Sequence, residues 1–142
     1  KKNSRAIISG ITAGVLSSLT SILLLALLFG WDHASYATFL PKSITTAIGM
    51  GVSEELGGIV PITVVAIIIT GVLGNIFAES FLKLLHIKEP IAKGIALGSA
   101  SHAIGTARAM EMGTIEGATS GLSIVVCGIL TVVGASLFAI II

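Results

Sequence analysis

The run of uncharged residues from Ala6 to Phe29 constrains the fold more than any other feature of this sequence. At about 1.5 Å of rise per residue, a helix over this run is about 36 Å long, which exceeds the roughly 30 Å of a hydrocarbon core. Its leucine, isoleucine and valine side chains favour insertion into lipid, and its hydroxyl side chains can bond to the backbone of their own helix. The run therefore predicts a membrane-spanning helix over residues 6–29.

The chain as a whole is equally unsuited to water. Its 142 residues are 54% hydrophobic and 11% charged, and a small soluble domain cannot bury so much apolar surface. Two further apolar segments predict spanning helices over residues 59–85 and 114–142. We therefore expect an all-α, polytopic bundle of transmembrane helices that forms a single integral membrane domain over residues 1–142.

Two segments do not have the length or the composition of ordinary spanning helices. Residues 42–56 follow Pro41 and end at Gly57-Gly58, which predicts a half-helix or re-entrant helix buried in protein or lining a cavity. Residues 91–112 are rich in glycine and serine, and this composition predicts a broken or packed helix inside the bundle.

Basic residues indicate how the chain is oriented. They form two groups, Lys1/Lys2/Arg5 and Lys83/Lys88/Lys93, and the positive-inside tendency puts both groups on the cytoplasmic side. The number of crossings between the groups must then be even. A re-entrant segment at residues 42–56 satisfies this condition, whereas a full crossing there does not.

The half-helix carries a candidate site for an anion. Its polar or small residues share one helical face, namely Lys42, Thr45, Thr46, Gly49 and Ser53, with Ser43 beside them. A helix N-terminus has positive partial charge, and the Lys42 ammonium adds a full charge, so this face can hold a small anion. The alternative is that Lys42 extends to the membrane interface and the threonines bond to backbone carbonyls.

A second candidate face lies in residues 91–112. The i, i+3, i+4 spacing groups Gly98, Ser99, His102, Gly105, Thr106 and Ala109. Ionisable groups at membrane depth are functional candidates, so His102 is expected to bind a carboxylate or to take up a proton coupled to transport. The alternative is a structural histidine that bonds to a neighbouring helix.

Other classes of function find no support in the sequence. The formal charge of +1 gives no argument for nucleic acid. There is no Ser/His/Asp set, no metal-ligand spacing and no phosphate-binding glycine loop, so we expect neither an enzyme nor a bound cofactor or metal. We interpret the single Cys127 as a packing residue, and we expect Glu79 to pair with Lys83 one helical turn away.

Several strings of residues resemble one known family, the LrgB/CidB family of holin-like and antiholin-like bacterial membrane proteins. In the family's order they are Pro41-Lys42-Ser43-Ile44-Thr45-Thr46, Glu55-Leu56-Gly57-Gly58-Ile59, Pro90-Ile91-Ala92-Lys93-Gly94 and Ser101-His102-Ala103-Ile104-Gly105-Thr106-Ala107. Ala47 departs from the pattern, because we expect proline there in many members. The chain begins without methionine and resembles about the C-terminal three-fifths of that family, so we expect it to be the C-terminal portion of a longer protein.

This resemblance implies a multi-pass protein of the bacterial cytoplasmic (inner) membrane, and it leaves three alternatives for the function. The first is a carrier for a small monocarboxylate such as pyruvate or glycolate, with one half of an inverted-repeat, transporter-like fold in this chain. Its substrate-binding residues would be Lys42, Ser43, Thr45, Thr46, Ser99, His102, Gly105 and Thr106. Control of murein hydrolase activity and autolysis would follow from the movement of metabolites. The second is an oligomeric pore, or a regulator of one, that acts with a small holin-like partner; a third treats the polar faces only as helix contacts.

Overall fold

The computed structural model describes residues 4–142, and its regular structure within that range is entirely helical. It contains α1 (Ser4–Phe29), α2 (His33–Phe39), α3 (Thr46–Glu55), α4 (Val60–Leu84), α5 (Pro90–Met112) and α6 (Thr114–Phe138). The expected all-α class with broken and re-entrant helices is therefore confirmed. Lys1 and Lys2, which belong to the first basic group, lie outside the described residues.

Three helices form the membrane-spanning frame. α1, α4 and α6 have 26, 25 and 25 residues and are long and apolar enough to cross a bilayer. They lie close to the expected spans over residues 6–29, 59–85 and 114–142, although α6 ends at Phe138. Their leucine and isoleucine side chains are widely exposed, as lipid-facing surfaces require. α1, α2 and α6 bury a shared core that includes Tyr36 and Cys127, which agrees with a packing role for this cysteine.

α2 and α3 form a hairpin, the first hairpin (residues 33–55), that enters and leaves at one end of the bundle. Asp32 caps α2 by accepting a hydrogen bond from the Ser35 amide at 2.9 Å, and hydrogen bonds from Ser35 hold the pKa of this carboxyl below its ordinary value. At the other end of the segment, the Leu56 carbonyl lies 3.0 Å from Nε2 of His33. The start and the end of the first hairpin are therefore neighbours.

The turn of the first hairpin carries Lys42. α3 begins only at Thr46, so Lys42 lies before the helix and not within the half-helix expected over residues 42–56. The two arms are close, because a Cβ added at Gly49 would lie 3.5 Å from the carbonyl oxygen of Pro41. The segment thus reaches into the bundle and turns back.

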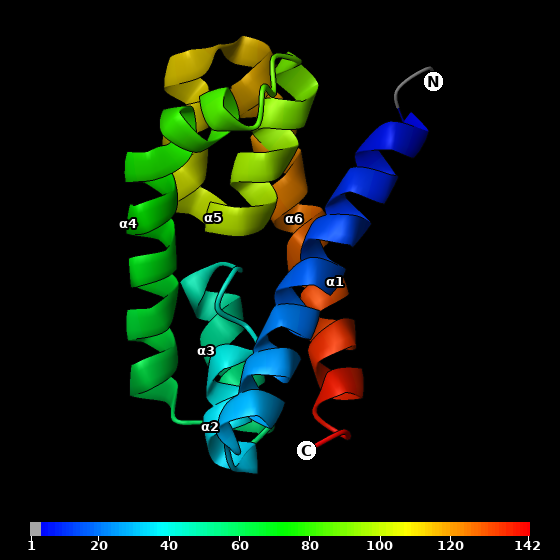
Figure 1. The fold of residues 1–142 in the computed structure, drawn as a ribbon, viewed down its shortest axis with the longest axis vertical. Helices are drawn as coiled ribbons and strands as arrows, with labels where there is room; N and C mark the ends of the chain where they lie inside the picture. The colour runs from blue at the N-terminus through cyan, green and yellow to red at the C-terminus, as the bar shows by residue number, and fades with distance from the viewer. Residues whose placement is uncertain (1–3) are drawn as a thin grey trace.

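α5 is a second hairpin (residues 90–112), because the helix breaks in its middle. Ser101 (φ −132°, ψ 15°) and His102 (φ 42°, ψ −136°) have non-helical backbone. After the break the chain runs back along itself, since a Cβ added at Gly105 would lie 2.9 Å from the carbonyl oxygen of Leu97. Figure 1 shows this hairpin at one end of the bundle and α2 and α3 at the other.

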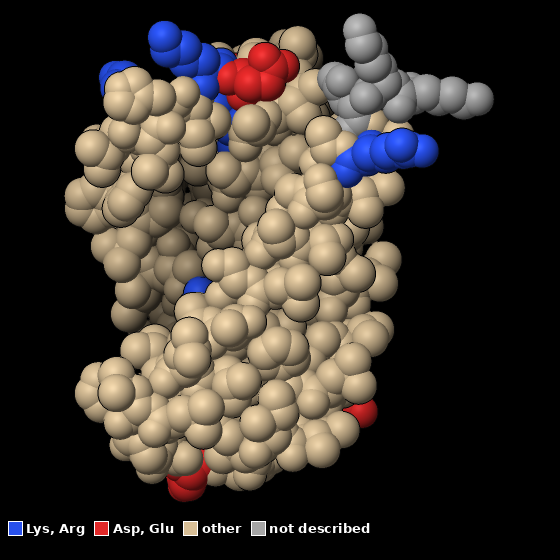
Figure 2. Space-filling model, turned by 45° about the vertical axis from the view of Figure 1, so that its right-hand side comes forward, with Lys and Arg blue, Asp and Glu red and all other residues tan. Residues whose placement is uncertain are grey.

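The re-entrant path of the first hairpin places the basic groups together. The start of α1 and the α4–α5 connection lie at the same end in Figure 1, so Arg5 is at the end that also carries Lys83, Lys88 and Lys93. On the face shown in Figure 2, lysine and arginine gather at this end beside an acidic cluster, and the charged side chains visible at the opposite end are acidic. This arrangement is typical of a membrane protein whose basic end faces the cytoplasm.

Candidate functional site

A cavity of about 900 Å³ lies where the turns of the two hairpins meet α1 and α4. Figure 2 shows the molecule hollowed at mid-height on this face, with a basic side chain at the edge of the hollow. The polar lining comes from all four elements and consists of Ser17, Ser18, Ser21, Lys42, Ser43, Thr70, Ser99 and Ser101. Because residues 14–21 are central in α1, the polar part of the cavity lies near the middle of the membrane-spanning frame, and its apolar part extends to Leu85 and Ile87 beyond the end of α4.

Lys42 is the one charged side chain that lines this cavity within the described part of the chain. It is half-buried, and its Nζ donates hydrogen bonds to Oγ of Ser43 at 2.9 Å and Oγ of Ser18 at 3.3 Å. Ser18 in turn donates to Ser43 at 3.0 Å. No acidic residue lines the cavity among residues 4–142, so the ammonium has hydroxyl neighbours but no opposite charge. Such a site can accept an anion.

His102 occupies the break in α5 but does not line the cavity. Its imidazole is 3% exposed, and Nε2 lies 2.9 Å from the backbone carbonyl oxygen of Ile67 in α4. Since a carbonyl only accepts hydrogen bonds, Nε2 carries the proton in this contact. Gly71 provides the space, because a Cβ there would lie 2.6 Å from Cε1 of His102. The imidazole therefore joins the second hairpin to α4, as the structural alternative expected.

The other expected residues support the hairpin turns. Thr106 donates to the carbonyl of His102 at 2.9 Å and pairs with the hydroxyl of Ser120 at 2.7 Å. Gly105 lets the two arms of the second hairpin approach. Thr45 and Thr46 stand at the start of α3, and neither lines the cavity. Of the eight expected residues, the cavity unites Lys42, Ser43 and Ser99.

Three serines of α1 line the cavity and were not among the expected site residues. Ser17, Ser18 and Ser21 follow Gly14 at spacings of three, four and seven residues, so all four share one helical face. A polar face on a spanning helix was therefore visible in the sequence. Its contact with Lys42 is the hydrogen bond from Lys42 to Ser18, which joins residues 24 positions apart. No local sequence pattern indicates such a contact.

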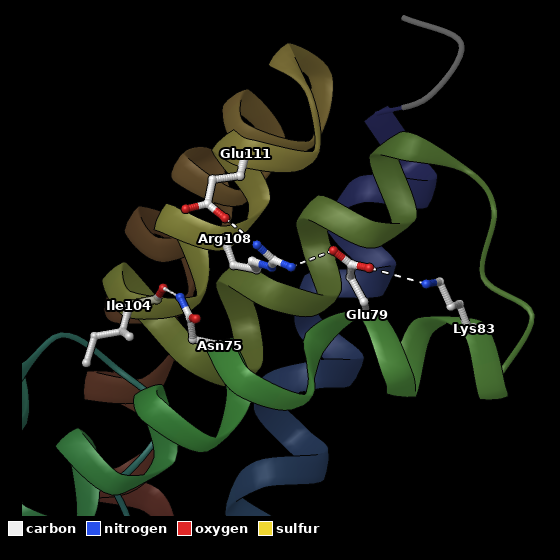
Figure 3. A network of polar contacts seen from close by, with 6 residues as sticks. All are labelled: Asn75, Glu79, Lys83, Ile104, Arg108 and Glu111. Atoms are coloured by element: carbon white, nitrogen blue, oxygen red, sulfur yellow. Dashed lines mark hydrogen bonds and ion pairs between the residues drawn. The ribbon is translucent and has the colours of Figure 1, made fainter.

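A polar network fastens the second hairpin to α4 at the basic end, as Figure 3 shows. Arg108 forms ion pairs with Glu79 and Glu111, and Glu79 also pairs with Lys83 at 3.3 Å, which confirms the expected pair. One turn deeper, Nδ2 of Asn75 donates to the carbonyl of Ile104 at 2.9 Å. The arm that follows the break is thus held along α4. Among residues 4–142 no group of histidine, cysteine or acidic side chains could hold a metal ion.

The two hairpin turns are similar in sequence and in contacts. Residues 43–49 and residues 99–105, which lie 56 positions apart, share serine, alanine, isoleucine and glycine at four of seven positions. In each turn the final glycine approaches the carbonyl eight residues earlier: Gly49 approaches Pro41, and Gly105 approaches Leu97. Two segments with the same sequence pattern therefore make the same turn.

The same spacing of 56 residues relates the walls of the cavity. Adding 56 to the residue numbers of α1 gives approximately those of α4, and adding 56 to those of the first hairpin gives approximately those of the second hairpin. The lining of the cavity follows it as well, with the pairs Gly14/Thr70, Ser17/Leu73, Ser18/Gly74 and Ser21/Phe77. The cavity thus lies between two units of equivalent order, each with a spanning helix followed by a hairpin.

Comparison with known proteins identifies relatives of the chain. The sequence model of the LrgB-like family matches residues 1–141. Proteins named antiholin-like protein LrgB from Bacillus mycoides (strain KBAB4) and Bacillus cereus (strain B4264) are 40% identical over 132 residues, which is 93% of this chain and 57% of each relative. The chain thus spans less than two thirds of the length of these relatives. No solved structure matches the chain.

Proposed function

The chain belongs to the LrgB-like family, and we propose that it acts in a carrier that moves a small monocarboxylate, of the pyruvate or glycolate kind, across the bacterial cytoplasmic membrane. The observation that carries this proposal is the position of Lys42. Within the described residues it is the one charged group in a mainly apolar cavity, and serine hydroxyls surround it between the two hairpin turns. A three-carbon acid presents a carboxylate to this ammonium and a hydroxyl or carbonyl oxygen to the serines.

The energetics favour a functional lysine at this depth. An ionisable group at membrane depth is costly and for that reason marks a functional site by default. An anion that replaces lost water at Lys42 offsets this cost through a charge-assisted hydrogen bond. Ser18 and Ser43 hold the Nζ atom in place, so the nitrogen is positioned before the substrate arrives.

We also propose that both units of an inverted repeat lie within this chain, in place of the one half that the resemblance implied. The first hairpin enters from one end of the bundle and the second hairpin from the other (Figure 1), while residues 56 positions apart line the cavity. Carriers built in this way bind their substrate between the repeats and expose the site to each side in turn. Movement of one hairpin and its spanning helix against the other would achieve this.

Reconstitution tests the proposal. Liposomes that contain the protein and a trapped dye should take up labelled pyruvate or glycolate saturably and keep the dye. Lys42→Ala should lower apparent affinity about ten- to hundred-fold, because a hydrogen bond to a charged group contributes about 1.5–3 kcal/mol. Lys83→Ala is the matched control, since this lysine lies outside the cavity with a side chain 79% exposed. Equal uptake by all three proteins would overturn the proposed site.

The names of the relatives support a second candidate function. They are called antiholin-like, and a pore or a pore regulator, acting with a small holin-like membrane partner, would suit that name. The same liposomes separate the two candidates, because a pore releases the dye whereas a carrier retains it. In the carrier proposal, control of murein hydrolase activity and autolysis follows from the metabolites moved. The Lys42→Ala protein, with its weakened substrate affinity, should then also restore this control poorly in cells.

A further inference from the structure

Among residues 4–142, no acidic side chain lines the cavity beside Lys42 or forms an ion pair with it. α1 contributes only serine and glycine to the polar side of the cavity. The titratable groups of the other elements face elsewhere: Glu79 pairs with Arg108 and Lys83, His102 bonds to Ile67, and Tyr36 donates to the carbonyl of Phe138. His33 bonds to Leu56 at the outer end of the first hairpin, where Glu54 and Glu55 also lie exposed. An ammonium in such a place is costly until an anion arrives.

We propose that Lys42 is the proton-coupling residue of the carrier, losing its proton when the cavity is empty and regaining one as the carboxylate binds, so that one proton crosses with each anion. This inference rests on the proposed function and deepens it, because it names the coupling ion and the residue that carries it. It also moves the coupling role away from His102, whose ring is committed to a backbone carbonyl outside the cavity.

The hydroxyl pair around Lys42 suits both protonation states. Ser18 and Ser43 lie within hydrogen-bond distance of Nζ and of each other. A serine hydroxyl can either donate or accept. It therefore accepts from the ammonium when Lys42 is charged, and one hydroxyl can rotate to donate to the neutral amine. Neither state leaves the nitrogen without a partner.

The transport step conserves charge and protons. On the entry side, the neutral amine of Lys42 takes a proton from water as the carboxylate enters, and the ammonium and carboxylate form an ion pair. On the exit side, the carboxylate leaves and the ammonium returns its proton to water. The loaded site and the empty site both carry no net charge. The site can therefore change its access from one side of the low-dielectric membrane to the other at a similar free-energy cost in both states.

Proton-coupled uptake of pyruvate into liposomes tests the inference, with protein-free liposomes as the blank. In the unaltered protein, an alkaline interior should stimulate uptake, a potassium diffusion potential without a pH difference should not, and a trapped pH dye should report one proton for each pyruvate. Lys42→Arg keeps a permanent charge. Any uptake or exchange of pyruvate that this variant shows should not be stimulated by the pH difference.

His102→Gln separates the two candidate proton sites. Its carboxamide can still donate to the Ile67 carbonyl, so uptake should keep its response to the pH difference. The inference is overturned if Lys42→Arg responds to pH as the unaltered protein does, or if uptake by the unaltered protein carries net charge. The proton count in the unaltered protein decides the matter even if Lys42→Arg fails to fold. If the unaltered protein shows no saturable pyruvate uptake, the carrier proposal fails as well. If uptake is saturable but carries net charge, only the coupling inference fails.

Discussion

Nε2 of His102 lies 2.9 Å from the backbone carbonyl oxygen of Ile67, and this bond fixes the broken point of α5 against the middle of α4. The positive φ of 42° at His102 is uncommon for a residue with a side chain, so surrounding contacts must hold the turn in place. The imidazole bond and the Thr106–Ser120 pair are two such contacts. The turn that presents Ser99 and Ser101 to the cavity therefore depends on packing behind it.

Replacing His102 should affect stability more than affinity. His102→Ala removes the donor to the Ile67 carbonyl and empties a buried site, which should cost about 1–3 kcal/mol. His102→Gln is the control and should recover part of this loss, because it keeps a donor. Thermal unfolding in detergent and pyruvate affinity should be measured on both variants. A fully stable His102→Ala protein that no longer binds pyruvate would contradict a supporting role and return His102 to the binding site.

Gly71 is expected to tolerate no side chain while His102 is present. A Cβ at Gly71 would lie 2.6 Å from Cε1 and 2.9 Å from Nε2 of the imidazole, so Gly71→Ala should lower stability by about 1–3 kcal/mol. Gly121→Ala is a matched control in α6, because a Cβ there meets no atom within 4 Å. It should raise helix stability by about 0.5–1 kcal/mol. The double variant Gly71→Ala/His102→Ala should be less destabilised than the sum of the single variants; simple additivity would refute the contact.

Much of the frame could be predicted from sequence because lipid sets the length of a spanning helix. The uncharged runs therefore located α1, α4 and α6 to within a few residues, and the glycines and prolines marked the broken segments. The residues that line the cavity were harder to predict from the sequence. A helical-wheel argument assumed one continuous helix over residues 98–109, but the break at Ser101 and His102 puts Ser99 and Thr106 on different arms. Likewise, α3 begins at Thr46, so Lys42 lies outside that helix and does not share a helical face with its residues.

The Thr106–Ser120 pair offers a measure of how strongly the second hairpin is held to α6. Thr106→Val leaves the Ser120 hydroxyl without this partner, and Ser120→Ala does the reverse. A double-mutant cycle on thermal unfolding should give a coupling energy of about 0.6 kcal/mol and at most about 1.7 kcal/mol, the average and the maximum for hydrogen bonds between membrane helices. Ser136→Ala should change little, because that exposed hydroxyl bonds only to Val132 of its own helix. A coupling energy of zero would mean that the pair does not hold the hairpin.

The re-entrant path of the first hairpin predicts which loops share a side of the membrane. Cys127 is the single cysteine, so Cys127→Ala provides a background for labelling single introduced cysteines in intact cells with a membrane-impermeant maleimide. Asp32→Cys and Glu55→Cys, at the two ends of the hairpin and exposed, should both react from outside. Lys88→Cys, at the basic end, should react only after permeabilisation, because basic loops stay in the cytoplasm. If Asp32→Cys and Glu55→Cys react from opposite sides, residues 33–55 cross the bilayer fully, and the meeting of two hairpin turns at Lys42 is lost.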